Sequence, residues 1–107
     1  MSERALGELE HVVLLAILRL GREAYGVPIV DEIERRTGRA PSRAAVYVAL
    51  TRLENKGLVS SRLGEPTRER GGKARRFFRL QPEGLARLRE ARATLSRMWE
   101  GLEPAVD

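Results

Sequence analysis

The stretch PSRAAVYVALTRLENKGLVSSRL, residues 41–63, constrains the fold of this chain more than any other. Ser42 is a good helix N-cap, because its side-chain oxygen can accept from an unpaired backbone amide. Gly57 stands where a left-handed C-terminal cap belongs. The interval between them predicts a helix from about Arg43 to Lys56.

The two faces of this expected helix differ in chemistry. One is apolar and predicts a core contact, with Val46, Ala49, Leu50 and Leu53. The opposite face is small and nearly uncharged, with Ala44, Val48, Thr51 and Asn55, and has Arg43, Tyr47, Arg52 and Lys56 at its margins or ends. Short side chains suit close approach to DNA base edges, and the flanking cations suit phosphates. An ordinary amphipathic helix fits the pattern too, so the role of this helix must be inferred together with the rest of the chain.

Two helices are expected before this one. The run from about Leu6 to Leu20 is apolar around most of its circumference, which favours burial against its own domain and against a neighbouring subunit, where we expect Leu9 and Val13. His11 lies in it without a second histidine, and we assign it no chemistry.

A second helix is expected from Val27 to Thr37, burying Val30 and Ile33. Its polar positions are expected to be exposed: Asp31, Glu32, Glu34 and Arg35. A short glycine-containing connection, residues 38–42, then leads to the third helix, as in helix-turn-helix units.

Two alternating segments after Gly57, residues 58–63 and 74–80, predict an antiparallel hairpin. The connection between them contains Pro66, Gly71 and Gly72, which permit tight turns, and a basic tip with Arg68, Arg70 and Lys73. At least one of Phe77 and Phe78 is expected in the core. Appended to three helices, this hairpin is a wing whose cations could follow the DNA backbone or enter a minor groove.

A last helix is expected to start at Gln81 and Pro82. It carries a heptad-like stripe broken by Arg92, with Leu85, Leu88, Leu95, Trp99 and Leu102. The stripe suits packing on the first helix of a second subunit. Trp99 is expected to anchor that interface, and the alternative is that it lines a cavity between subunits that receives flat apolar molecules.

Charge is concentrated in one part of the chain, whose net charge is +5 over 107 residues. Residues 39–80 carry eleven Lys or Arg against three acids, and the remainder carries nine against twelve. This placement favours a localised surface for a polyanion. One histidine, no cysteine and no metal-ligand spacing argue against an enzyme, a metal site or a cofactor.

No stretch has the length of apolar sequence that a membrane span needs, and the N-terminal residues lack the pattern of a signal peptide. We therefore expect a cytoplasmic protein without a membrane partner.

Taken together and in this order, four motifs resemble the PadR type of transcriptional regulator, in its short form with a single C-terminal helix. They are LGELEHVVLLAIL at residues 6–18, EAYGVPIVDEIE at 23–34, AVYVALTRLENKGLV at 45–59 and GGKARRFFRLQPEG at 71–84. The resemblance implies a mainly α (α+β) winged helix-turn-helix fold, with a three-helix core, a two-stranded β-wing and a long C-terminal dimerisation helix. It also implies a homodimer and repression that a small ligand relieves. Many relatives have tyrosines at the positions that Phe77 and Phe78 occupy here, and a threonine at the position of Gln81.

The sequence and the resemblance together predict a sequence-specific regulator that binds a pseudo-palindromic operator in double-stranded DNA. Residues 1–80 would form the DNA-binding domain and residues 81–107 the dimerisation helix, in one compact unit. The expected DNA contacts are Ser42, Arg43, Ala44, Tyr47, Val48, Thr51, Arg52, Arg70, Lys73, Arg75 and Arg76. The expected dimer contacts are Leu9, Val13, Leu85, Leu88, Leu95, Trp99 and Leu102.

A small apolar or aromatic effector is expected beside Trp99. The alternative function is a winged-helix protein-interaction module, whose basic face meets an acidic partner without site-specific DNA binding. Sequence preference among DNA duplexes separates the two, because a protein-binding module should show little.

Overall fold

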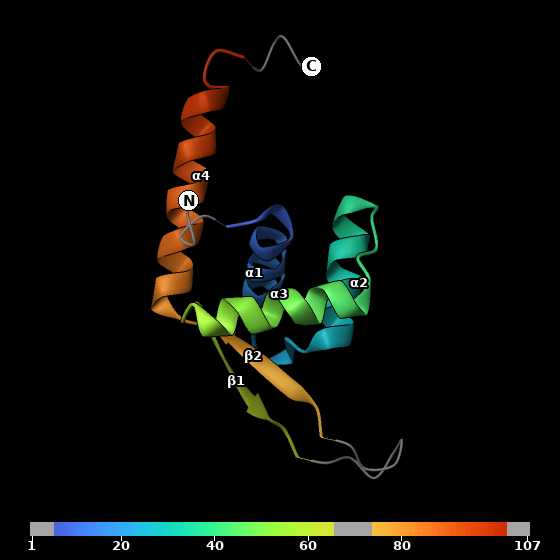
Figure 1. Cartoon of the computed structure of the whole chain (residues 1–107). Coiled ribbons are helices and arrows are strands. Elements are labelled where there is room, and N and C mark those ends of the chain that lie inside the picture. The colour runs from blue at the N-terminus through green and yellow to red at the C-terminus, as the bar shows by residue number, and fades with distance from the viewer. Residues whose placement is uncertain (1–5, 66–73, 103–107) are drawn as a thin grey trace.

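The computed structural model describes residues 6–65 and 74–102. Three helices are followed by a hairpin and a long fourth helix (Figure 1), which confirms the predicted α+β architecture. The elements are α1 (Glu8–Leu20), the 3-10 turn η1 (Gly21–Glu23), α2 (Gly26–Thr37), α3 (Arg43–Asn55), β1 (Val59–Leu63), β2 (Arg76–Leu80) and α4 (Pro82–Trp99).

The caps of α3 are as predicted. The Ser42 side chain accepts a hydrogen bond from the backbone N of Ala45 at 3.0 Å, and Gly57 adopts φ +77° just after the helix. The apolar face of α3 is buried throughout: Val46, Ala49, Leu50 and Leu53. Burying a side chain such as Leu50 stabilises the fold by about 1.5–3 kcal/mol. The opposite face of α3 is thereby held outward.

Helix α1 is the central element of the core. It packs against α2, α3, β2 and α4 (Figure 1), with Val13, Leu14 and Ile17 buried among them. Val13 was predicted at a subunit contact, and this prediction is wrong, because the side chain is 0% exposed within its own domain. The outward apolar side chains of α1 are Leu15 and Leu18 instead.

The hairpin pairs β1 with β2 in antiparallel register, from Val59 opposite Leu80 to Leu63 opposite Arg76. Phe78 is buried on the core side, as expected for one of the two phenylalanines. The backbone N of Phe78 also donates to the O of Ala24 at 2.8 Å. The segment just before α2 therefore lies along β2, where Tyr25 and Phe77 form an isolated antiparallel bridge.

Helix α2 differs from its prediction at two positions. Glu32 is buried instead of exposed, because Arg35 and Arg36 fold back along the helix and donate to its carboxylate. Ile29 is fully buried, whereas Val30 is only partly covered. The two guanidinium groups supply what a buried carboxylate needs, a charged partner with hydrogen bonds.

Helix α4 starts against the core and then leaves it (Figure 1). The backbone N of Gln81 donates to the O of Leu58 at 2.9 Å, and the Gln81 side chain donates to Ser60. Leu88 is only 5% exposed, so the prediction of Leu88 as a dimer contact is wrong: it is a core residue. The second half of α4 extends beyond the other helices, and the molecule measures 54 × 28 × 22 Å. None of the helices described here is long and apolar enough to cross a membrane.

Candidate nucleic-acid interface

The exposed face of α3 carries short, uncharged side chains at its centre. Its four inner residues, Ala44, Val48, Thr51 and Asn55, are all exposed, and Val48 is 51% accessible. None carries a charge or a long side chain. Such a face can approach another surface closely, at the distance a helix needs to touch base edges in a major groove.

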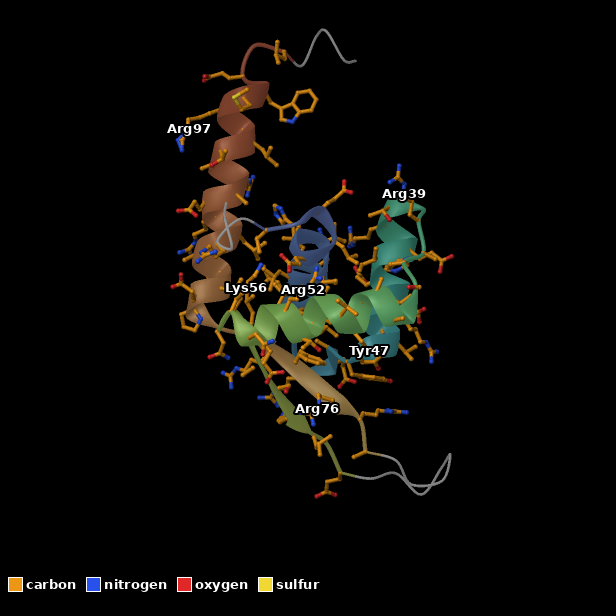
Figure 2. All side chains as sticks on the ribbon, in the orientation of Figure 1. Arg39, Tyr47, Arg52, Lys56, Arg76 and Arg97 are labelled. Atoms are coloured by element: carbon orange, nitrogen blue, oxygen red, sulfur yellow. The ribbon has the colours of Figure 1, made fainter. Side chains whose placement is uncertain are left out.

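Different side chains border the two margins of this face. Tyr47, 47% exposed, lies on the side from which the wing descends, and Arg52 lies on the side of α1 (Figure 2). Arg43, at the N-terminal end, is exposed. The Ser42 hydroxyl, predicted to contact DNA, is engaged in capping α3.

The Tyr47 side chain rests on the first residue of α2. A Cβ atom at Gly26 would lie 2.3 Å from the phenol oxygen of Tyr47 and 2.8 Å from its Cζ. Gly26 is buried, and only a residue without a side chain leaves room for the ring. The direction of Tyr47 therefore depends on α2 as well as on α3.

Lys56, expected at the border of this face, is held by α1 instead. Its Nζ lies 3.0 Å from Oε1 of Glu10, and the backbone N of Gly7 donates to the same carboxylate oxygen at 3.0 Å. Burial opposes ionisation of Glu10, but the bonds from Gly7 and Lys56 outweigh it and lower its pKa. The pair ties the C-terminal end of α3 to the N-terminal end of α1.

Glu10→Gln is expected to lower the free energy of unfolding at pH 7 by about 1 kcal/mol, because a charge-assisted bond becomes a neutral one. The folded-state pKa of Glu10 is below its ordinary 4.5, so its contribution is complete above that pH and is lost as pH falls through the lowered pKa. Urea unfolding from pH 7 to pH 3 should show wild type and variant converging at the acid end. A constant difference would contradict an ionic role.

The base of the wing carries Arg75 and Arg76, both exposed. Arg76 donates to the hydroxyl of Ser61 at 3.0 Å, and that hydroxyl donates to Glu54 at 2.8 Å. These bonds connect the wing with the exposed side of α3. Glu54 and Ser61 were not singled out from the sequence, because only the fold brings them together.

Two arginine side chains flank a pair of aromatic rings beside the wing. The guanidinium of Arg75 lies 4.8 Å from the ring centroid of Tyr25, and that of Arg62 lies 4.9 Å from Phe77. The rings of Tyr25 and Phe77 meet edge to face at 5.2 Å. Neither Arg62 nor Tyr25 was identified from the sequence as part of this surface, although Tyr25 lies in the motif at residues 23–34.

Two other arginines lie away from this surface, and two predicted contacts lie outside the described residues. Arg39, counted in the basic stretch, lies past the far end of α2, and Arg97 lies on the outer part of α4 (Figure 2). Arg70 and Lys73, predicted DNA contacts at the wing tip, lie outside the described residues.

A cleft of about 760 Å³ lies between α1 and α4. Its apolar lining includes Leu15 and Leu18 from α1, and Leu95 and Trp99 from α4. Leu15, Leu18, Leu95 and Trp99 are each between 42% and 52% exposed. The predicted effector residue Trp99 thus lies at an open apolar groove.

Comparison with known proteins gives concordant results. Residues 14–90 match the family described as Transcriptional regulator PadR-like family. A protein of Lysinibacillus sphaericus is 30% identical over 108 residues, covering 99% of this chain and 91% of the relative. The structure of a PadR family transcriptional regulator from Eggerthella lenta is 30% identical, with a TM-score of 0.68 and coverage of 94% and 87%. A PadR-like transcription factor from Bacteroides fragilis is 26% identical, with a TM-score of 0.72 and coverage of 91% and 88%.

Proposed function

The chain belongs to the PadR-like family of transcriptional regulators, and from this premise we propose that it binds a specific DNA site with α3 in the major groove. The observation that carries the proposal is the exposed face of α3, small and neutral at its centre with Arg43, Tyr47 and Arg52 around it. Short side chains such as Thr51 read base edges and thymine methyls, and the arginines bind phosphates.

The wing supplies attraction that does not depend on sequence. Three exposed arginines lie next to α3: Arg62 on β1, Arg75 just before β2 and Arg76 on β2. Each phosphate that a cation neutralises releases counterions and steepens the salt dependence of binding. Arg70 and Lys73, outside the described residues, stay predicted DNA contacts.

We propose that the active species is a homodimer joined through α4, with residues 81–107 as its dimerisation segment. The support is the apolar surface that the isolated chain leaves uncovered: Leu15 and Leu18 on α1, and Leu95, Met98, Trp99 and Leu102 at the end of the chain described here. Contiguous apolar surface of this kind marks an interaction site. Leu9 and Leu85, both half-buried, would border it.

Two-fold symmetry of such a dimer would place two α3 helices in successive major grooves, about 34 Å apart, on a pseudo-palindromic operator. Repression then needs nothing beyond occupancy, because a bound dimer excludes other proteins from the same stretch of DNA.

A small effector is proposed to bind beside Trp99 in the cleft between α1 and α4, where the cleft would remain as a cavity between the two subunits, and to change the spacing of the two α3 helices. Its aromatic wall is Trp99, and the ionisable side chains among the described lining residues are basic: His11, Arg89 and Arg92. An apolar or aromatic molecule with a negative charge would satisfy both parts of this lining.

Aromatic anions are expected to quench the fluorescence of Trp99 saturably, and matched aromatic cations are expected to do so at least about tenfold more weakly, because arginines line the cleft. The sequence has one tryptophan, so the signal has one source. Arg92→Gln serves as the control and should reduce the preference for anions. Quenching without saturation by either class would contradict an effector site.

Selection from a pool of random duplexes tests the proposal as a whole, followed by fluorescence anisotropy near physiological salt. The selected duplex should contain two related half-sites about 10 base pairs apart. It should bind roughly a thousandfold or more tighter than a shuffled duplex of equal composition. A pool that fails to converge, with equal weak binding to both duplexes, would favour the protein-interaction module.

A further inference from the structure

Ala24 and Tyr25, which link η1 to α2, and Gly26, the first residue of α2, contact both elements that the proposed function places on DNA. Ala24 bonds to β2 through its carbonyl oxygen, Tyr25 contacts the aromatic and basic side chains of the wing, and Gly26 underlies Tyr47 of α3. Neither Tyr25 nor Gly26 belongs to the predicted DNA-contacting set. We call residues 24–26 the junction.

On the wing side, the junction acts through Tyr25. Its ring meets Phe77 edge to face at 5.2 Å and carries the Arg75 guanidinium at 4.8 Å. A free arginine side chain samples many rotamers, and stacking on a flat ring restricts it to a few. Arg62 is held in the same way by Phe77, at 4.9 Å. Tyr25 thus supports the chain of contacts that orients the cations of the wing.

On the helix side, the junction acts through the absence of a side chain. The phenol of Tyr47 occupies the space where any other residue at position 26 would place its Cβ, at 2.3 Å from the oxygen. No real Cβ approaches an oxygen so closely, so a methyl group there must move the ring. Gly26 thereby fixes which way Tyr47 points from α3.

We infer that Tyr25 and Gly26 are positioning residues for DNA recognition, with Tyr25 orienting the wing arginines and Gly26 orienting Tyr47. The inference rests on the proposed function. The two residues are adjacent, and the junction is hydrogen-bonded to β2. One short segment therefore fixes the position of the wing relative to α3. Neither residue needs to touch DNA itself.

The first test is a double-mutant cycle between Gly26→Ala and Tyr47→Ala, measured by anisotropy on the selected duplex and on the shuffled one. Gly26→Ala alone should weaken binding to the selected duplex about tenfold by displacing Tyr47, with the salt slope unchanged. In the Tyr47→Ala background the same substitution should cost less than about twofold. Equal losses in both backgrounds would overturn the role of Gly26.

Gly7→Ala is the matched control, since Gly7 also lies at a helix N-terminus and its added Cβ would find only an ordinary contact at 3.9 Å. It should leave DNA binding unchanged. Gly26→Ala should melt near the wild-type temperature, because alanine favours a helical position. A Gly26→Ala variant that loses affinity only by unfolding would also overturn the inference.

The second test concerns Tyr25. Tyr25→Leu removes the ring and should weaken binding to both duplexes by about threefold to tenfold, with the salt slope reduced by about 1. Tyr25→Phe keeps the ring and should stay within about twofold of wild type. In the Arg75→Ala background, Tyr25→Leu should add less than about twofold. An unchanged salt slope in Tyr25→Leu would overturn the role of Tyr25.

Arg75→Lys provides a measurement that does not depend on the stability of Tyr25→Leu, because Arg75 is exposed. Lysine keeps the charge but lacks the flat group that stacks, so a loss of about threefold is expected when Tyr25 is present. Binding equal to wild type would overturn the stacking role. Failure of the proposed function is separate from these outcomes, because wild-type protein would then show no preference for any duplex.

Discussion

Val48→Glu is expected to abolish site-specific DNA binding, with a loss of at least about a hundredfold in affinity for the selected duplex. Val48 is half-exposed at the centre of the outward face of α3. A glutamate side chain there can extend into solvent, so the variant should fold without a change in the core. Its carboxylate would face base edges between two rows of phosphates. Like charges in such close apposition cost several kcal/mol, and about 2.7 kcal/mol already corresponds to a hundredfold.

The measurement is anisotropy on the selected and shuffled duplexes, with thermal melting to show that the fold is intact. Arg39→Gln is the control, because it changes the net charge by the same single unit at the far end of α2 (Figure 2). It should bind within about twofold of wild type. Val48→Glu binding as tightly as Arg39→Gln would mean that α3 is not the recognition helix.

Local signals were sufficient to predict α3. Ser42 and Gly57 act on backbone groups within a few residues of themselves, so their effect can be read from the sequence without knowing the rest of the fold. The apolar spacing of Val46, Leu50 and Leu53 likewise gave the buried face correctly. The outward face follows by exclusion, and with it most of the residues proposed to contact DNA.

Helix α1 shows where periodicity fails. It is apolar around most of its circumference, so no single stripe stands out, and the sequence could not tell which residues face the core. The structure buries Val13, Leu14 and Ile17 and leaves Leu15 and Leu18 outward. That choice is made by α2, α3 and β2, which are distant in the sequence.

The junction and Glu32 show a second limit. The burial of Glu32 depends on two arginine side chains folding back, which a count of charged positions does not reveal. The contacts of Tyr25 and Gly26 join residues 21 to 52 positions apart in the chain. Glycine at position 26 offers no side-chain signal at all, and its importance is visible only as the space that Tyr47 fills.

The double substitution Leu95→Glu with Trp99→Glu is expected to convert the protein to a monomer and to lower operator affinity at least about a hundredfold. Both side chains are about half-exposed on α4, and neither belongs to the buried core of its own domain. Carboxylates in a buried apolar contact lose their hydration without gaining a partner. DNA affinity falls as well, because the second half-site is no longer bound at the high effective concentration that a dimer provides.

Sedimentation equilibrium measures the association state, and anisotropy measures the consequence for DNA. Arg97→Glu is the matched control, since it changes the net charge by the same two units, and Arg97 points away from the body of the domain (Figure 2). It should remain a dimer. Because Leu95 and Trp99 lie beyond the folded core, the double variant should keep the helical content of wild type and still bind random duplex through α3 and the wing. A double variant that sediments like Arg97→Glu would exclude this part of α4 as the dimer contact, and would leave its exposed apolar side chains to a different partner.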